Sequence, residues 1–407
     1  MNARIVLGVI GIGGATVLLG QLGSVDASGP AQLETIEPAV RFVGDEGTLG
    51  TDHAQPIGAI GPDVIVGFIP NFSNFTEGDE PTKRAYSFGT TSCNAGDETL
   101  RWQSSTKFHP VIGQSMYRYD GRSFEHIGQS FLKHGFCALS GNECGFGCQS
   151  TGCSTLGVGC SDPYGSGLNA NRFYLGPKYQ VNAATGDFPY PFANISYTGN
   201  LAKRLIVNRS DVEAASNPGA KYFVEAQYIT SDDNVAGGNS WNNASYRGVN
   251  LASDGAVVGF IGGTEREKPA LFAWTVEDPE VSFQRIEVPD DGNYYIAHRV
   301  YDNGDGTWDY HYAIMNFDSH RSARSLNIPI PAGVNVSNFD FHDVDYHSGE
   351  IWDGTDWAVA IGGTTLTWET GAYNTSLPDF DNVDNAIRWG TTYSFSFRAD
   401  TAPQKAN

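Results

Sequence analysis

Short apolar runs alternate with turn-forming residues along most of the chain, a pattern typical of β-strands rather than helices. Two clear strands are predicted at 63–69, an apolar run that ends at Pro70, and at Lys221–Thr230. Residues 28–60, before the first of them, are rich in Gly, Ala, Asp and Pro. We interpret this stretch as a variable leader or linker.

A hairpin is predicted over residues 114–127, where the dipeptide Asp120-Gly121 separates two alternating runs. Asp-Gly is a strong signal for a two-residue hairpin turn. With this dipeptide as the whole loop, Tyr117 would lie opposite Phe124.

Predicted strands become regularly spaced from about residue 280, with Gly and Pro turns between them. Short strands at this spacing are typical of a β-sandwich. We therefore expect an all-β protein of two domains: an irregular β domain at 61–275 and an Ig-like or jelly-roll-type β-sandwich at 280–400. The predicted strands of the sandwich are Tyr294–Tyr301, Trp308–Asn316, Ala323–Ile330, Val336–Phe341, Trp357–Ile361, Thr365–Glu369, Ala386–Trp389 and Thr392–Ala399.

Residues 1–27 have the layout of a secretory signal peptide. Arg4 gives the charged start, residues 5–20 are mostly apolar, and Val25 and Ala27 occupy the −3 and −1 positions of a small-residue cleavage site. A membrane anchor is the alternative, but the apolar stretch is short for a span and contains five glycines. No later segment is long and apolar enough to span a bilayer, so we expect a secreted protein, extracellular or periplasmic.

The six cysteines all lie in one part of the chain, and five of them crowd into the loop 137–160. An even number of cysteines behind a signal peptide predicts disulfides that staple this Gly-rich loop, with the pairing left open. A zinc knot is the alternative, although the C-x3-C-x4-C-x6-C spacing fits common zinc patterns poorly. The cysteines are Cys93, Cys137, Cys144, Cys148, Cys153 and Cys160.

The chain is acidic, with 46 Asp and Glu against 25 Lys and Arg, so its net charge is 25 − 46 = −21. This charge disfavours nucleic-acid binding, which needs a basic face. Lys203, Arg204 and Arg209 form one modest basic group. The sequence contains no P-loop, Gly-x-Ser-x-Gly elbow or His-Glu-x-x-His motif, and we expect no nucleotide cofactor.

A predicted hairpin over residues 294–315 places two histidines where they could share a metal ion. If its loop holds four residues, His298 lies opposite His311, with Cβ atoms about 4.5–5.5 Å apart. Asp309 and Met315 would share the face of His311. Such donors suit copper or another first-row divalent metal, whereas hydrogen-bonded structural histidines are the plain alternative.

The densest run of potential ligands lies between Phe339 and Glu350. In a straight strand Asp343, Asp345 and His347 share one face, and His342 points the other way. These side chains could bind a divalent ion or act as general acid and base. The alternative is a strand that ends in a solvated polar loop.

Three further histidines, His109, His126 and His134, are secondary candidates in the first domain. A site shared with the second-domain histidines would be a sensible ligand location, since ligands favour domain clefts. Calcium is a further candidate ion, at the loop 232–234, where a solvated turn is the alternative. Residues 302–306 fit a turn better than a calcium loop, because position 1 of that loop would be Tyr301. Exposed tryptophans, Trp352 above all, could form a platform for sugars.

The stretches 114–136, 222–247 and 341–354 resemble a family of uncharacterised secreted bacterial proteins. Two sequence segments carry that resemblance: Phe-His-Asp-Val-Asp-Tyr-His-Ser-Gly-Glu at 341–350 and Ala-Ile-Arg-Trp-Gly-Thr-Thr-Tyr-Ser-Phe. It implies no activity that could be transferred. Residues 310–338 are similar to bacterial Ig-like modules of surface proteins, which bears on fold alone.

Together these patterns predict a secreted metal-binding protein, an oxidative or hydrolytic enzyme acting on an extracellular polymer such as a polysaccharide. The alternative is a non-catalytic adhesion, carbohydrate-binding or surface structural protein. A metal-free hydrolase using two carboxylates is a third interpretation. The oligomeric state is left open.

Overall fold

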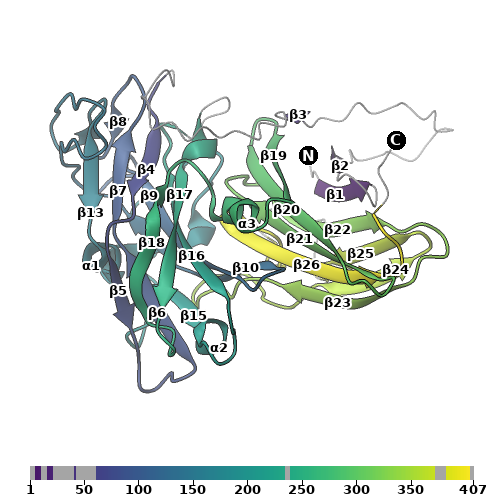
Figure 1. Ribbon diagram of the computed structural model, residues 1–407. Coiled ribbons are helices and arrows are strands. Elements are labelled where there is room, and N and C mark those ends of the chain that lie inside the picture. The colour runs from purple at the N-terminus through teal and green to yellow at the C-terminus, as the bar shows by residue number, and fades with distance from the viewer. Residues whose placement is uncertain are drawn as a thin grey trace, which may run out of the picture. The chain divides into compact units, whose positions relative to one another are not determined.

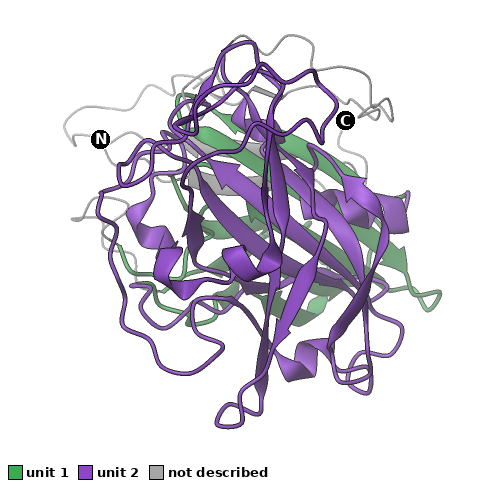
Figure 2. Ribbon diagram, turned by 90° about the vertical axis from the view of Figure 1, so that its left-hand side faces the viewer, with its two compact units in different colours: residues 1–44, 280–342, 352–407 green, residues 45–279, 343–351 purple. Residues whose placement is uncertain are grey.

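The computed structural model describes residues 61–233, 239–371 and 382–403, together with the backbone of three strands before residue 45 (Figure 1). Strands dominate, and helices in the described residues contain three to five residues each. The expected all-β class is therefore confirmed. The chain divides into two compact units, coloured separately in Figure 2. Unit 1 comprises residues 1–44, 280–342 and 352–407, and unit 2 comprises residues 45–279 and 343–351.

Unit 2 is built mainly from one large sheet, in which strands follow the order β18-β17-β16-β9-β10-β15-β6-β5. Off this path, β11 pairs with β9, and β14 pairs with β11. Smaller sheets are β13-β7-β4 and β12-β8. The strands are β4 (Val64–Phe68), β5 (Phe72–Phe75), β6 (Lys83–Phe88), β7 (Thr90–Asn94), β8 (Leu100–Arg101), β9 (Val111–Tyr119), β10 (Phe124–Gln129), β11 (Leu132–His134), β12 (Thr155–Leu156), β13 (Ser161–Tyr164), β14 (Leu175–Gly176), β15 (Leu205–Asn208), β16 (Lys221–Ile229), β17 (Ala244–Leu251) and β18 (Val257–Glu265). The helices are α1 (Ser166–Asn169), η1 (Arg172–Tyr174), η2 (Lys178–Gln180), α2 (Arg209–Val212), η3 (Ser240–Asn242), η4 (Ala270–Phe272) and α3 (Ala273–Glu277).

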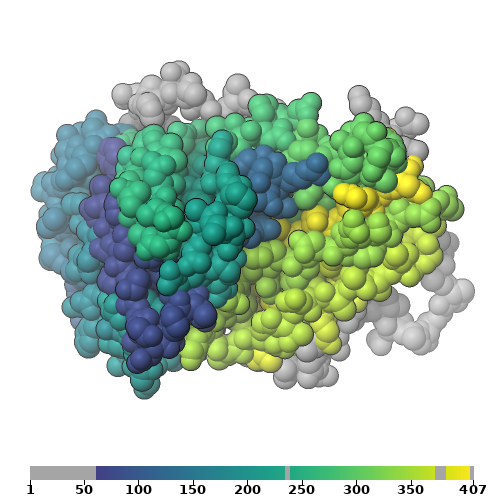
Figure 3. Space-filling model, turned by 60° about the horizontal axis from the view of Figure 1, so that its bottom comes forward, coloured from purple at the N-terminus to yellow at the C-terminus, as the bar shows by residue number. Residues whose placement is uncertain are grey.

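The large sheet curls until its two edge strands, β5 and β18, meet. Asn74 on β5 joins them: its side-chain amide donates to the Val257 carbonyl, and its side-chain oxygen accepts the Val257 N–H, both at 2.9 Å. In the space-filling view, dark-blue residues from the beginning of unit 2 border green residues from later in the same unit (Figure 3). A side chain thus replaces backbone pairing where an exposed sheet edge would otherwise remain.

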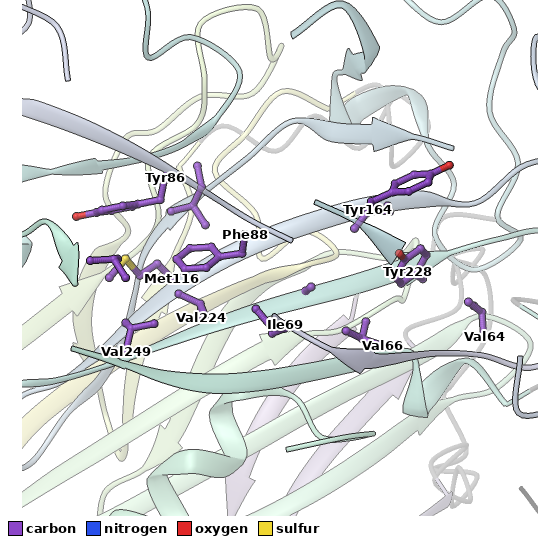
Figure 4. Close-up of a cluster of buried hydrophobic side chains, with 14 of the residues drawn as sticks. Val64, Val66, Ile69, Tyr86, Phe88, Met116, Tyr164, Val224, Tyr228 and Val249 are labelled. Carbon is purple, nitrogen blue, oxygen red and sulfur yellow. The ribbon is translucent and has the colours of Figure 1, made fainter. Parts of the chain in front are cut away.

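The core of unit 2 lies inside this curl. Alternate residues of the strands point inward, as the period of two requires. Figure 4 shows these side chains, which include Tyr86, Phe88, Met116, Val224 and Val249. All of them are buried. Their burial is the main force that holds the sheet together.

The cysteine-rich loop is stapled by three disulfides, Cys93–Cys144, Cys137–Cys153 and Cys148–Cys160. The predicted disulfides are thus confirmed, and the zinc alternative is wrong because each sulfur is bonded to another. Gly67 on β4 lies against the first disulfide. A Cβ at that position would collide with the sulfur atoms of Cys93 and Cys144.

Unit 1 contains two sheets, of order β23-β26-β21-β20-β19-β3 and β2-β1-β22-β25-β24. Aromatic side chains pack between them; Trp368 lies 5.6 Å from Phe395 and 6.1 Å from Phe339, ring centre to ring centre. Unit 1 is therefore sandwich-like, whereas the Ig-like detail stays a prediction. The strands are β1 (Ile5–Ile10), β2 (Thr16–Gln21), β3 (Arg41–Phe42), β19 (Ser282–Val288), β20 (Gly292–Asp302), β21 (Trp308–Asn316), β22 (Ala323–Pro329), β23 (Val336–His342), β24 (Ala358–Gly362), β25 (Thr365–Glu369) and β26 (Thr391–Ala399).

Residues 386–389 were expected to form a strand, and this is wrong. Ile387 forms only an isolated bridge with Ala323. Nearby polar groups occupy this stretch: Arg388 donates to the Asn382 carbonyl, and Asp384 accepts from Arg324. The local backbone is therefore held by side chains rather than by a ladder.

The N-terminal predictions fall largely outside the described residues. β1 and β2 pair with each other, and β1 pairs with β22, but Val25 and Ala27 of the predicted cleavage site are not described. The leader 28–60 likewise lies outside them except for β3. Within the described part of the chain, no helix is long and apolar enough to cross a membrane. The signal peptide stays a prediction.

Candidate functional site

The expected metal pair His298 and His311 does not form, because the hairpin register differs by one residue. The loop between β20 and β21 holds five residues rather than four, so His298 pairs with Tyr312 and His311 pairs with Arg299. A shift of one residue turns a side chain to the other face of the sheet. The two imidazoles therefore lie on opposite faces and cannot share an ion.

The auxiliary ligands proposed with this pair have other roles. Met315 is fully buried and pairs with Tyr295 inside the sheet. Asp309 accepts two hydrogen bonds from the guanidinium of Arg398, at 2.7 and 3.0 Å. The His298 ring stacks on Tyr312 with 5.9 Å between ring centres, and burial lowers its pKa to about 4. These contacts are structural.

The ligand-rich run 339–350 is divided between the two units. His342 ends β23 in unit 1, where it pairs with Ser394. Residues 343–351, which begin at Asp343, belong to unit 2 and pack against its large sheet. We call residues 343–351 the docked segment. His342 and His347 thus belong to different compact units.

Gln129, at the end of β10, is the main anchor of the docked segment. Its backbone carbonyl accepts the Nε2–H of His347 at 2.7 Å, and its side-chain amide donates to the Asp345 carbonyl at 3.0 Å. Its side-chain oxygen accepts from Lys178 Nζ at 2.9 Å. Glu350 completes the docking, since it accepts the backbone N–H of Lys178 at 2.7 Å.

Burial determines the protonation of the two titratable side chains that bind Gln129, His347 and Lys178. Burial, together with the nearby charges of Lys83 and Lys178, lowers the pKa of His347 to about 4, although the hydrogen bond to the Gln129 carbonyl opposes this shift. His347 is therefore neutral at pH 7 and donates from Nε2. Burial also lowers the pKa of Lys178, to about 8, against the opposing charges of Glu350 and Glu225. This donor set is built to hold the segment in place.

A pocket of about 350 Å³ opens between the docked segment and β6, β10 and β15. Ile127, Ile206 and Val207 supply its apolar part. Its polar and aromatic lining comes from Glu80, Lys83, Gln129, Ser196, Tyr197, Thr198, Lys203, Asn208, Asp345, Tyr346, His347 and Ser348. Two of the predicted site residues, Asp345 and His347, therefore do line a common cavity.

Several of the lining side chains are held in place by their neighbours. Asn208 donates to Asp345 Oδ2 at 3.2 Å. Lys203 is buried, its Nζ lies 4.6 Å from the centre of the Tyr197 ring, and burial lowers its pKa. The Tyr197 ring also faces the guanidinium of Arg172 at 4.6 Å. Tyr197 itself stays 43% exposed. Its ring is thus held by two cations, and part of the side chain stays accessible to a ligand.

The secondary histidines do not enter this pocket. His109 and His134 form a buried pair, in which Nδ1 of His134 donates to Nε2 of His109 at 3.0 Å. His109 Nδ1 in turn donates to the Gln103 carbonyl at 3.3 Å. Burial lowers the pKa of both rings, that of His109 to about 4. His126 is buried and stacked on Tyr117 at 4.6 Å.

The residues predicted to bind calcium or sugar lie outside this pocket. Asp232 forms an ion pair with Arg101, and Asn234 is outside the described residues. The Trp352 ring is covered by the guanidinium of Arg388 at 4.7 Å, so this face is not an open sugar platform. Across residues 61–233, 239–371 and 382–403, no group of three or more His, Cys, Asp or Glu side chains is placed to hold a metal ion.

Sequence analysis missed most of the pocket. Lys83, Tyr197 and Asn208 are far apart in the chain and carry no motif. The one usable signal was the basic group at 203–209, of which Lys203 lines the pocket and Arg204 packs over Phe75 at 3.8 Å.

The fold and the site together define a disulfide-stapled all-β protein with a ligand-sized pocket in unit 2. No family model, curated protein or solved structure matches the chain. The resemblance to secreted bacterial proteins therefore stays a prediction.

Proposed function

We propose that this protein is an extracellular binding protein that holds a saccharide unit of a polymer in the pocket of unit 2. The observation that carries the proposal is the pocket itself. It has a volume of about 350 Å³, and its lining combines a partly exposed tyrosine with hydrogen-bond donors and acceptors. Ligand pockets in proteins measure roughly 300–1,000 Å³.

The charges of the lining favour a hydroxyl-rich ligand over a simple anion. Lys83 and Lys203 are matched by Glu80 and Asp345. Sugar hydroxyls both donate and accept hydrogen bonds, so they can use both kinds of partner. Within the described residues, the ammonium of Lys83 has no ion-pair partner, which leaves it available to a ligand.

The aromatic wall fits the same ligand. A sugar ring presents a face of C–H groups that packs on an aromatic ring, and Tyr197 offers such a surface with its hydroxyl at the edge. Cation contacts from Lys203 and Arg172 fix the ring before binding, which lowers the entropy cost of association. Three disulfides fit an oxidising, extracellular setting.

The test is binding of the purified chain to an array of extracellular polysaccharides, followed by calorimetry with an oligosaccharide of the class that binds. Tyr197→Ala and Asp345→Ala should each weaken binding about tenfold or more, which corresponds to the loss of about 1.4 kcal/mol. Tyr190→Ala is the matched control, because Tyr190 is 40% exposed and lies outside the pocket. Circular dichroism of each variant checks folding.

Two outcomes would contradict the proposal. One is the absence of binding to every polysaccharide class tested. The other is binding that Tyr197→Ala and Asp345→Ala leave unchanged, which would place the ligand elsewhere.

A further inference from the structure

Three buried polar side chains from well-separated parts of the sequence lie close together near the start of β4. Asp63 precedes β4, Asp233 follows β16, and Asn242 ends η3. The Asn242 amide donates to Asp63 Oδ2 at 3.4 Å. The backbone N–H of Val64, the neighbour of Asp63, donates to Asp233 Oδ2 at 3.0 Å. These bonds bring the three side chains to one place.

Each of the three side chains keeps one oxygen without a donor. Among the described residues, Oδ1 of Asp63, of Asp233 and of Asn242 has no hydrogen-bond partner. The residues are only 3%, 1% and 2% exposed. A buried polar atom left unpaired is destabilising. Three such acceptors in one cluster therefore point to a missing positive partner.

The charges around the cluster also indicate that a positive partner is missing. Burial raises the pKa of Asp63 to about 6, and the charge of Glu267 adds to that effect. Burial likewise raises the pKa of Asp233 to about 7, and the charge of Asp63 contributes. Asn239 and Asn242 donate to Asp63 Oδ2, and the Asn243 side chain and the Asn239 backbone donate to Asp233, but neutral donors cannot balance the charge of two carboxylates.

The basic side chains close by are engaged elsewhere. Arg266 donates to the Gly67 carbonyl at 2.7 Å and packs over Phe68. Lys268 pairs with Glu265 at 3.2 Å. Arg101 pairs with Asp232, the residue next to Asp233. Within the described part of the chain, Asp63 and Asp233 therefore form no ion pair with a lysine or arginine.

We propose that Asp63, Asp233 and Asn242 form a binding site for a hard divalent cation, Ca²⁺, with these three Oδ1 atoms as ligands. Carboxylate and amide oxygens are the donors that Ca²⁺ prefers, and its coordination shell tolerates irregular geometry and added water. The absence of thiolate and imidazole from the described part of the cluster disfavours copper and zinc. The ion would tie β4, the end of β16 and η3 together.

Two simpler occupants could satisfy the same oxygens. Protons on the carboxyl groups would relieve the repulsion, and buried water could donate to the amide oxygen. Neither would make stability depend on a metal ion. The cation proposal is therefore separable from both by titration with Ca²⁺.

The test uses the full chain, freed of metal with a chelator and then titrated with Ca²⁺ by calorimetry, with Tb³⁺ luminescence as a second readout. Thermal unfolding is followed in parallel. At a hundredfold excess of Ca²⁺ over Kd, the melting temperature should rise by about 5–10 °C. Mg²⁺ should compete weakly, because it demands smaller octahedral geometry.

Asp63→Asn and Asp233→Asn separate a cation site from a structural role. Each should weaken Ca²⁺ binding about tenfold or more and remove the thermal shift. In chelator, each variant should melt no lower than the parent, since a buried charge is lost while the shape is kept. Asp232→Asn is the matched control and should bind Ca²⁺ as the parent does.

The proposal is overturned if the chelator-treated chain binds no Ca²⁺. It is equally overturned if Asp63→Asn and Asp233→Asn bind Ca²⁺ as tightly as the parent. Variants that melt lower than the parent in chelator, with an unchanged response to Ca²⁺, would show that the two carboxylates are structural acceptors only.

Discussion

His347 donates its Nε2–H to the main-chain carbonyl of Gln129 across 2.7 Å, although the two residues lie 218 positions apart. Gln129 also holds Asp345 and Lys178 through its side chain. One residue at the end of β10 therefore fixes a wall of the pocket.

Replacing His347 should loosen the docked segment. His347→Ala removes the hydrogen bond to Gln129 and the edge contact with Phe131, whose ring centre lies 5.2 Å away. It leaves a buried carbonyl unpaired, so we expect the free energy of unfolding to fall by about 2–3 kcal/mol. Urea unfolding measures the loss. Ser348→Ala, at an exposed neighbour, should change stability by less than about 0.5 kcal/mol. Equal effects of the two changes would refute the anchor.

The buried pair of His109 and His134 should make stability depend on pH. Burial lowers the pKa of His109 to about 4, below the value of about 6.5 for an unfolded chain. The unfolded state therefore binds protons first, and the stability present above pH 6.5 is lost as the pH falls toward 4. From His109 alone we expect the free energy of unfolding to fall by about 2 kcal/mol between pH 7 and pH 5.

Urea unfolding at pH 7 and pH 5 measures the slope of the free energy of unfolding against pH. His109→Gln keeps a polar side chain of similar size but cannot take up the proton, so the slope should become shallower. A slope unaffected by His109→Gln would mean that His109 does not contribute to the pH dependence.

Gly67→Ala should disturb the disulfide Cys93–Cys144. A Cβ there collides with both sulfur atoms, and the buried Cys93, tied to Cys144 by the disulfide, cannot move aside without strain. We expect a loss of about 1–3 kcal/mol and free thiols in the purified protein, which thiol titration counts. Gly165→Ala is the control, since Gly165 has φ −65° and nothing within 4 Å of an added Cβ. Parental stability and thiol content in Gly67→Ala would contradict the predicted collision.

Asn74→Ala should open the seam between β5 and β18. It removes both hydrogen bonds to Val257 and leaves two backbone groups unpaired, for an expected loss of about 1–3 kcal/mol. Amide hydrogen exchange at Val257 should accelerate. Asn74→Asp keeps the acceptor and loses the donor, so its effect should be intermediate. Slow exchange at Val257 in Asn74→Ala would show that backbone contacts alone close the seam.

Strand positions could be predicted from sequence, but strand registers could not. The Tyr294–Tyr301 and Trp308–Asn316 predictions agree with β20 and β21 to within a few residues. Their loop holds one residue more than expected, because Asp305 accepts from Thr307 and the Asn303 N–H bonds to the Thr307 carbonyl. That single residue separated His298 from His311.

The hairpin at 114–127 shows the same limit. Asp120 Oδ1 accepts the N–H groups of Arg122 and Ser123, at 2.8 and 2.7 Å, so the loop holds four residues and Phe124 pairs with Tyr119 instead of Tyr117. A side chain that imitates a turn changes the loop length, which no alternation pattern records. A shift of two residues preserves the face of each side chain, so this error was harmless.

The disulfides could be predicted because composition and clustering suffice for them, whereas the pocket depends on long-range contacts. Asp345 and His347 were selected as candidates for their chemistry, but their true neighbours, Gln129 and Asn208, come from strands more than 130 residues earlier. Only the folded sheet brings these residues together.

The docked segment has a consequence for dissecting the protein. Its flanks belong to unit 1, so unit 2 is not encoded by one uninterrupted stretch of the gene. A fragment that stops at Pro279 would lack Asp345, His347 and Glu350, exposing the ring of Phe131 and the side chain of Lys178 to water. Appending the codons for 343–351 behind a flexible linker is the direct way to restore that missing wall.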